Sequence, residues 1–426
     1  MRAALHRLVE QLISTGDIKI QYADGTSHRY GDGSGPPFEI IFHDKARERA
    51  ILTDPTLAFG EGYMDGDIEI RQGTLYDALD LLYTQARRIG MATPLAKIGE
   101  GIRFAKRRLD QWNTISRSRE NVAHHYDISN ARYETFLDED LQYSCAYFED
   151  EGQSLDAAQL AKKRHIAAKL CLRPGDRVLD IGCGWGGMGL YLAKVAEADV
   201  TGITLSDEQL ALANQRAEAD GVKDRARFIA QDYRLMSDEV DRIVSVGMFE
   251  HVGLNNFDTY FQQCRELLKD DGVMLVHSIG RSDGPGITNP FISKYIFPGG
   301  YIPALSEVLP AIEKAGLVVT DIEILRLHYA ETLRAWRERF FAAPHTVPPA
   351  DDPRFCRMWE FYLVISELAF RRIGMMVFQI QATPDQSAVP LTRDYIAEAE
   401  ARLKRAERRD YGHLHEDHPG RAYAAE

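Results

Sequence analysis

The sequence predicts an α/β protein built on a mostly parallel sheet that helices cover on both faces, preceded by a smaller α+β unit. From about residue 160 onward, short apolar runs alternate with stretches whose apolar residues have helical spacing, which is the pattern of a parallel sheet with crossover helices. The first of these runs leads into a glycine-rich turn, a common entry to the ligand site of an α/β sheet.

The glycine-rich stretch is the centre of this organisation. Residues 178–181 are typical of a buried strand, residues 182–187 form the turn, and residues 188–194 have helical spacing. Glycine permits positive φ and a close approach of backbone to ligand, so a purely structural turn and a dinucleotide site also fit. Asp180, two residues before the first glycine, makes the stretch resemble the S-adenosylmethionine loop of class I methyltransferases.

The remaining strands and helices follow in alternation. Further strands are expected at 199–204, 227–230, 242–246, 272–277, 317–324 and 375–381, and helices at 160–172, 210–220 and 257–269. Ser206 and Gln209 form a capping box before the second of these helices. The strand ends carry Gly182, Thr204, Asp232, Glu250 and His277. Because the carboxyl ends of parallel strands meet at one edge, where ligands bind, these residues predict a site there.

Residues 1–90 are expected to form the smaller unit. Residues 5–13 have helical spacing, residues 17–22 and 38–42 indicate strands, and Asp24-Gly25 indicates a hairpin turn. Residues 75–86 form a helix with one apolar face. The spacing of residues 58–67, rich in glycine and acid, favours a set of tight turns.

A basic stretch follows this unit. Residues 87–119 contain nine basic residues and two acidic ones, a net charge of +7 within a chain whose net charge is −13. A solvated linker over 91–119 and a surface for anionic lipid headgroups both explain this positive charge. Near an anionic membrane, each basic residue contributes about 1 kcal/mol to the free energy of binding. We expect the catalytic domain to occupy residues 120–426.

The later part of that domain contains three further features. Residues 281–310 predict a lid or substrate loop, and the tail from Ala401 is expected to fray. Helices over 331–342 and 355–373 are rich in aromatic residues, which either form core or line an acyl channel. These residues are Trp336, Phe340, Phe341, Phe355, Trp359, Phe361, Tyr362 and Phe370.

Composition excludes several classes of protein. The net charge of −13 argues against a general nucleic-acid binder. The five cysteines are scattered, so no zinc site, other metal site or disulfide framework is expected, and a reducing cytoplasm fits. We find neither a signal peptide at the N-terminus nor an apolar run long enough to span a membrane, so any membrane contact should be peripheral, on the inner face.

Several longer motifs resemble the cyclopropane-fatty-acid synthase family, which includes the mycolic acid cyclopropane synthases. The resemblance covers about residues 120–380 in the family's order, with a softer similarity at 60–66. The motifs lie at residues 124–127, 142–148, 178–187, 231–234, 242–253, 277–280, 294–299 and Tyr329. Because these motifs are long, chance agreement with the family is remote. The resemblance implies transfer of a methylene from S-adenosylmethionine to the cis double bond of a phospholipid acyl chain.

The resemblance also implies which residues hold S-adenosylmethionine. They are Tyr143, Ser144, Asp180, Gly182, Cys183, Gly184, Gly186, Thr204, Leu205, Ser206, Gln209, Asp232 and Tyr233. Many class I methyltransferases place an acid after the second strand to bind the ribose hydroxyls. Thr204 stands there in this sequence, as in the cyclopropane family, and Gln209 is the expected substitute.

A second set of residues follows from the family's acceptor chemistry. An alkene attacks the sulfonium methyl and becomes a carbocation, and a base then removes a proton from the new methyl before the ring closes. In the family a bound bicarbonate is that base. The matching motifs assign its binding to Cys145, Glu250, His277 and Tyr329, so that an anion stabilises the developing positive charge in an apolar pocket.

Alternatives remain at this point. A close relative could add a methyl or methylene branch without closing a ring, although the four anion-binding residues favour the ring. A non-enzymatic lipid-binding protein on a decayed methyltransferase frame is disfavoured by the intact Asp180 loop. The family often dimerises, so a homodimer is a possible assembly, and the expected partner is a membrane surface of unsaturated phospholipid.

Overall fold

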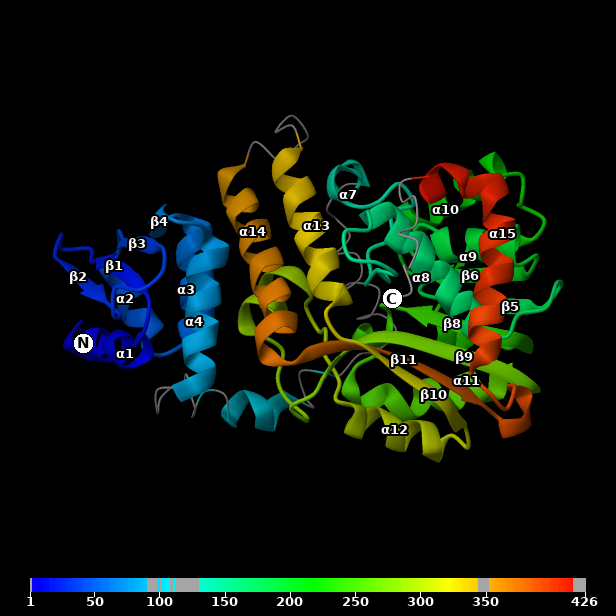
Figure 1. Ribbon diagram of the computed structural model, residues 1–426. Helices are drawn as coiled ribbons and strands as arrows, with labels where there is room; N and C mark the ends of the chain where they lie inside the picture. Colours follow the sequence, from blue (N-terminus) through cyan, green and yellow to red (C-terminus); the bar gives the residue numbers. More distant parts are fainter. Residues whose placement is uncertain are drawn as a thin grey trace, which may run out of the picture.

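The computed structural model describes residues 2–89, 99, 101–107, 111, 130–343 and 352–416. Its first part is a small α+β unit with a four-stranded sheet in the order β2-β1-β3-β4 (Figure 1). The elements are α1 (Arg2–Leu12), β1 (Asp17–Gln21), β2 (Ser27–Tyr30), β3 (Pro37–Phe42), α2 (Lys45–Ile51), α3 (Pro55–Asp65), β4 (Ile68–Gln72) and α4 (Leu75–Ile89). The predicted hairpin is confirmed, since β1 and β2 pair antiparallel around Gly25, whose φ is +85°.

The prediction of tight turns over 58–67 is wrong, because most of this stretch is helix α3. The side chain of Asp54 caps the helix by accepting from the Leu57 N–H, Pro55 occupies the first turn, and Gly66 ends the helix in the left-handed conformation. The internal glycines permit close packing. A Cβ on Gly60 would lie 2.5 Å from the Phe291 ring, and one on Gly62 would lie 2.6 Å from Ile68.

The larger unit contains the predicted doubly wound sheet, in the order β10-β11-β9-β8-β5-β6-β7. Strands β5 to β9 run parallel, and β11 is antiparallel to both of its neighbours. The strands are β5 (Arg177–Ile181), β6 (Asp199–Thr204), β7 (Ala226–Ala230), β8 (Val240–Val246), β9 (Leu268–Arg281), β10 (Val318–Leu325) and β11 (Met375–Thr383). The order reverses between β5 and β8, which places the ligand crevice beyond the carboxyl ends of these strands.

Helices cover both faces of this sheet, as predicted. They are α8 (Leu155–Lys169), α9 (Gly187–Val195), α10 (Asp207–Ala219), α11 (Phe257–Leu267), α12 (Leu305–Lys314) and α15 (Asp394–Glu416). Helix α7 (Asn130–Phe136) packs instead against the helix at His328–Ala342. Ser206 caps α10, accepting from the Gln209 N–H at 3.3 Å. The other half of the predicted capping box is wrong, because the Ser206 N–H donates to the Thr204 hydroxyl and not to the Gln209 side chain. The tail is not frayed over its described length, because α15 packs on α8 and buries Glu407, whose carboxylate lies 2.5 Å from the Arg164 guanidinium.

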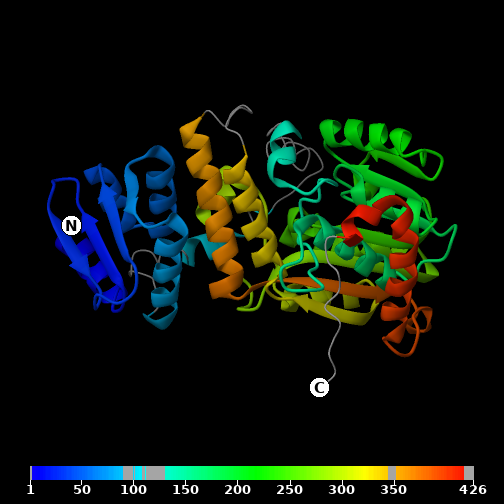
Figure 2. The same ribbon diagram turned by 45° about the horizontal axis from the view of Figure 1, so that its top comes forward.

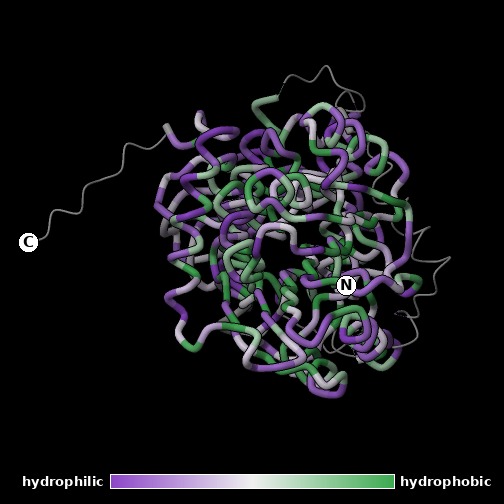
Figure 3. Tube along the Cα trace, turned by 90° about the vertical axis from the view of Figure 1, so that its right-hand side faces the viewer, coloured by the Kyte–Doolittle hydropathy of each residue, from purple (hydrophilic) through white to green (hydrophobic). Residues whose placement is uncertain are grey.

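Two aromatic helices separate the small unit from the sheet. Helix α13 (His328–Ala342) and helix α14 (Pro353–Leu368, followed by a π-helical turn at Ala369–Ile373) stand side by side, and α3 and α4 pack against α14 (Figures 1 and 2). Most of the predicted core aromatics are buried there, whereas Phe341 is exposed. Apolar segments gather inside the molecule and hydrophilic ones at its periphery (Figure 3). Within the described chain, no helix combines the length and apolarity that a membrane span requires.

Candidate active site

Two adjoining cavities lie beyond the carboxyl ends of the parallel strands. The first, the glycine-loop cavity, lies over the turn after β5, and the second, the apolar cavity, lies between β9, β11, α13, α14 and the loop at 287–302. Tyr143, Ser144, Gly247 and His251 line both cavities. The two cavities therefore adjoin at the wall that these four residues form.

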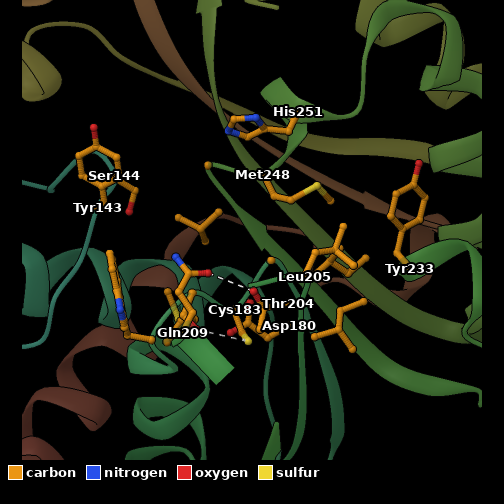
Figure 4. A pocket seen from close by; sticks show the side chains of 18 of the residues that line it. Tyr143, Ser144, Asp180, Cys183, Thr204, Leu205, Gln209, Tyr233, Met248 and His251 are labelled. Carbon is orange, nitrogen blue, oxygen red and sulfur yellow. Dashed lines mark hydrogen bonds between the residues drawn. The ribbon is translucent and has the colours of Figure 1, made fainter. Parts of the chain in front are cut away.

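The glycine-loop cavity gathers most of the residues expected to hold S-adenosylmethionine. Its floor presents Asp180, Cys183, Thr204 and Gln209, with Tyr143 and Ser144 on one side and Tyr233 on the other (Figure 4). The expected residues that line it are Tyr143, Ser144, Asp180, Gly182, Cys183, Gly184, Thr204, Leu205, Gln209, Asp232 and Tyr233. Gly184 has φ +55°, and a Cβ added there would project into open space, so backbone is accessible to a ligand at this point.

The polar floor of this cavity is suited to a polar ligand. Burial raises the pKa of Asp180 to about 7, and its Oδ2 has no hydrogen-bond partner among the described residues. The Thr204 hydroxyl donates to the Gln209 amide oxygen at 3.0 Å, which leaves the amide nitrogen of Gln209 as a donor. Asp232 is held by the Arg234 guanidinium at 2.7 and 2.8 Å. Together these groups offer both acceptors and donors to a polar ligand.

Two of the expected donor-binding residues do not line the cavity. Gly186 begins α9 with φ +84°, and a Cβ there would lie 2.9 Å from the Phe228 ring. Ser206 caps α10, and its N–H donates to the Thr204 hydroxyl at 3.2 Å. Both residues shape the site from behind its wall.

Sequence reasoning missed a buried lysine beside this cavity. Lys162 on α8 donates to Gln142 Oε1 at 2.6 Å and to the Ser144 hydroxyl at 2.8 Å, and burial lowers its pKa. A lysine within a helical pattern indicates a solvated face, so the sequence carried no signal for this role. Other lining residues that were not assigned individually are Trp185, Met188, Gln231, Arg234, Met248 and His251. Burial lowers the pKa of His251 to about 4, so its imidazole is neutral.

The apolar cavity brings together the four residues of the predicted anion site. Cys145, Glu250, His277 and Tyr329 all line it, although they come from four separate segments. Glu250 Oε1 accepts from the Ile279 N–H at 2.7 Å, while Oε2 is buried without a hydrogen-bond partner among the described residues. Burial raises the pKa of Glu250 to about 7.

Two further members of this group, Cys145 and His277, are held in neutral forms. The Cys145 thiol donates to the Ala146 carbonyl at 3.2 Å, and burial raises the pKa of the thiol, so a thiolate is disfavoured. Burial lowers the pKa of His277 well below its ordinary value, and its Nε2 has no hydrogen-bond partner in the described part of the chain. Two orphaned polar atoms, Glu250 Oε2 and His277 Nε2, thus belong to one cavity. A small oxyanion that carries both acceptor oxygens and a hydroxyl fits such a pair.

The rest of the apolar cavity is suited to a hydrocarbon chain. The predicted lid contributes Ile287, Ile292 and Phe297, and the aromatic helices contribute Tyr362 and Phe370. Further apolar lining residues are Ile279, Leu333, Ile365, Ile373, Met375 and Val377. Thr56 on α3 and Tyr83 on α4 complete the lining from the small unit. Two of the predicted segments, the motif at 124–127 and most of the basic stretch, lie outside the described residues.

Comparisons with known proteins identify the family of this chain. Residues 113–380 match the family described as mycolic acid cyclopropane synthetase, and residues 4–91 match a family described as a domain of unknown function. The chain is 37% identical over 378 residues to the cyclopropane-fatty-acyl-phospholipid synthase of Escherichia coli K12, across 88% of this chain and 92% of that protein. It is 33% identical over 398 residues to the tuberculostearic acid methyltransferase UfaA1 of Mycobacterium tuberculosis, across 88% and 90% of the two chains.

A solved structure is similar to this chain as well. The cyclopropane synthase MmaA2 from Mycobacterium tuberculosis matches 62% of this chain and 97% of its own length, with a TM-score of 0.58 and 33% sequence identity. Together with the strand order, this confirms the predicted class I methyltransferase fold joined to a smaller N-terminal α+β region. The protein is a homologue of cyclopropane-fatty-acyl-phospholipid synthase, and the chain belongs to the mycolic acid cyclopropane synthetase family.

Proposed function

We propose that the protein is a cyclopropane synthase that transfers a methylene from S-adenosylmethionine to the cis double bond of an acyl chain in a phospholipid. The observation that carries this proposal is the junction of the two cavities. A polar cavity over the glycine loop adjoins an apolar one through Tyr143, Ser144, Gly247 and His251, with Glu250 and His277 on the apolar side. Relatives that cover most of this chain are named as a synthase and as a methyltransferase that act on fatty acids.

The glycine-loop cavity would bind the methyl donor. S-adenosylmethionine supplies a methyl group activated by its positive sulfonium. Asp180 Oδ2 and the Gln209 amide provide polar contacts at the floor, and Lys162 holds Ser144 in the shared wall. This wall orients the donor toward the apolar cavity, which lowers the entropic cost of bringing two reactants together.

The apolar cavity would bind the acyl chain and a bicarbonate. Ring closure requires loss of a proton from the transferred methyl, and bicarbonate would supply the base. Cys145, Glu250, His277 and Tyr329 would hold it, because they line one cavity and two of their polar atoms lack partners within the described chain. Apolar side chains around them exclude the water that would otherwise quench a carbocation.

The described part of the basic stretch supports a peripheral membrane contact. Residues 101–107 are helical, and Ile102 and Phe104 on this segment are 52% and 41% exposed. Lys106 is exposed beside them, whereas Arg103 is paired with Asp54. Apolar side chains next to basic ones suit the surface of an anionic phospholipid bilayer. We assign this segment to binding the cytoplasmic face of the membrane.

The small unit would act as an accessory domain for the lipid. The proposed division is 1–90 for this domain, 91–119 for the basic linker and 120–426 for the catalytic domain. Thr56 and Tyr83 line the apolar cavity, so this domain contributes directly to the acyl site. Glu61 Oε1 on α3 also accepts from Lys294 at 2.7 Å and from the Tyr295 hydroxyl at 2.9 Å, which ties α3 to the lid.

The test is incubation of the purified protein with S-adenosylmethionine and vesicles of a phospholipid with cis-unsaturated chains. Mass spectrometry should find acyl chains heavier by one CH₂ that resist mild hydrogenation. Glu250→Gln should form little of this product while still binding the donor. Unmodified lipid in the presence of bound donor would contradict the proposed activity.

A further inference from the structure

His277 is linked through its second ring nitrogen to a polar pair outside the apolar cavity. Its Nδ1 lies 3.2 Å from Nε2 of Gln379, the residue that faces it across the antiparallel β9–β11 pairing. Both side chains are buried, with 1% of each residue exposed. The hydrogen bond therefore persists without competition from solvent, and it fixes the orientation of the imidazole ring.

The orientation of the Gln379 amide is set by its other partner. Lys169 Nζ lies 3.0 Å from Gln379 Oε1, and it also binds Glu323 and, at 3.4 Å, Asp321. An ammonium group has only donors, so the atom of Gln379 that faces it must be the carbonyl oxygen. The amide nitrogen then faces His277 and donates to it.

This chain of donors and acceptors determines where His277 carries its proton. A neutral imidazole has one donor nitrogen and one acceptor nitrogen, and Nδ1 must be the acceptor because Gln379 donates to it. The proton is then on Nε2, which lacks a hydrogen-bond partner among the described residues. The neighbouring orphaned atom, Glu250 Oε2, is a carboxyl oxygen. One cavity thus presents both an N–H donor and a carboxyl group.

We propose that Gln379 is a positioning residue which, with Lys169, holds His277 as the tautomer protonated on Nε2, so that its N–H is aimed at an oxyanion in the apolar cavity. The identity of the oxyanion as bicarbonate rests on the proposed function, whereas the tautomer does not. Gln379 itself does not line the cavity, so it acts through His277.

The test replaces the donor by an acceptor. In Gln379→Glu, a carboxylate faces Nδ1, so we expect the proton to move to Nδ1 or the ring to become doubly protonated. Long-range ¹H–¹⁵N spectra of ¹⁵N-histidine-labelled, ligand-free protein report this protonation directly, and His277→Asn identifies the signal of His277.

Gln379→Met removes the donor without introducing a charge and should give a mixture of tautomers. Gln381→Met is the matched control, since this buried amide on the same strand binds Tyr395 and the Lys169 carbonyl instead of His277.

We expect Nε2–H in the wild type and in Gln381→Met, and a changed protonation in both Gln379 variants. Bicarbonate affinity, measured by titration with the ¹³C-labelled anion, should fall roughly tenfold or more in Gln379→Glu, the loss expected for one charge-assisted hydrogen bond. A wild-type proton on Nδ1, or Nε2–H retained in both Gln379 variants, would overturn the proposal. If the tautomer changes as expected but no protein binds bicarbonate, the positioning role of Gln379 stands and the proposed anion is wrong.

Discussion

At the scale of single residues, Gly184 is the position in the glycine loop where we expect an added side chain to weaken S-adenosylmethionine binding most. Gly184→Val should abolish detectable S-adenosylmethionine binding while the protein stays folded, because the new side chain projects into the cavity. Backbone strain at φ +55° adds a cost of about 1–3 kcal/mol. Isothermal titration calorimetry measures the binding.

Gly221→Val is the control for that strain. Gly221 has φ +67°, open space around an added Cβ, and no contact with the cavity. It should lose a similar amount of stability and keep its donor binding. Equal affinity of Gly184→Val and Gly221→Val for S-adenosylmethionine would show that the glycine loop does not bind this donor.

Cys145 is expected to contribute a hydrogen bond rather than a nucleophile, because burial raises the pKa of its thiol. Cys145→Ser should therefore keep appreciable kcat/KM, since a hydroxyl provides the same donor. Steady-state kinetics with dispersed lipid measures this. A Cys145→Ser variant that binds donor but is inactive, or a thioether trapped between Cys145 and the lipid, would indicate covalent catalysis instead.

Glu250→Gln should lose more activity than Cys145→Ser, on the order of a hundredfold, because it loses the acceptor oxygen in the cavity. The same variant should be more stable than the wild type at neutral pH. The folded-state pKa of Glu250 is about 7, above its ordinary value, so the folded protein binds the extra proton and wild-type stability falls as pH rises from about 4.5 to 7.

Above pH 7 the difference in stability between the ligand-free Glu250→Gln variant and wild type should be constant, at about 3 kcal/mol by linkage. Below about pH 4.5 it should vanish. Urea unfolding across this range measures the difference. A difference independent of pH would show that Glu250 titrates normally in the folded protein.

At the scale of elements, the sequence predicted the parallel strands closely, because each is a short apolar run bounded by turns. Helix α3 was missed, since its internal glycines disfavour a helix locally and are explained only by packing against Phe291 and Ile68. The prediction that the tail from Ala401 frays was wrong over the described part of α15 for a related reason. Its buried Glu407 pairs with Arg164, which lies 243 positions earlier in the chain.

Helix α8 shows most clearly what local patterns leave out. Its lysines, arginine and histidine are buried, although such residues normally mark a solvated face. Their partners are distant in sequence: Lys163 binds Asp140, and His165 lies between Glu323 and Glu400. The role of Lys162 beside Ser144 was hidden in the same way. The polar and glycine residues at the strand ends, such as Glu250 and His277, were predicted from the alternation of strands and helices. Other candidates, such as Cys145 and Tyr329, could be named only through the family motifs.

The basic stretch at residues 87–119 leads to a prediction at this scale. Replacement of Lys106, Arg107 and Arg108 by Gln should weaken binding to anionic vesicles by up to roughly a hundredfold at low salt, taking about 1 kcal/mol for each charge. The effect should shrink at physiological ionic strength, where screening acts over about 8 Å. Vesicle co-sedimentation measures binding. Activity on detergent-dispersed lipid should change less.

A matched control changes three exposed charges at the edge strand β7. Lys223, Arg225 and Arg227 are exposed, and their replacement by Gln alters the net charge equally. This variant should bind vesicles like the wild type. If both triple variants lose the same affinity, net charge rather than the basic segment explains the binding.

At the scale of the whole molecule, the small unit and the lid form one wall of the apolar cavity. Glu61→Gln should weaken the contacts of α3 with Lys294 and Tyr295, and so raise the KM for lipid several-fold while donor affinity stays constant. Glu69→Gln, a change on β4 of the same unit at a carboxylate that pairs with His43 and not with the lid, is the control. An unchanged KM for lipid in Glu61→Gln would show that the contacts between the small unit and the lid do not contribute to the acyl site.

The central claim is that the two cavities together convert an alkene into a cyclopropane with loss of one proton from the transferred methyl. S-adenosylmethionine with a fully deuterated methyl, supplied with a cis-unsaturated phospholipid, tests it most directly. The product should keep two deuterons and resist hydrogenation that saturates a methylene branch, and the rate should fall when bicarbonate is removed and recover when it is restored. A product that keeps three deuterons, or a rate indifferent to bicarbonate, would contradict this mechanism.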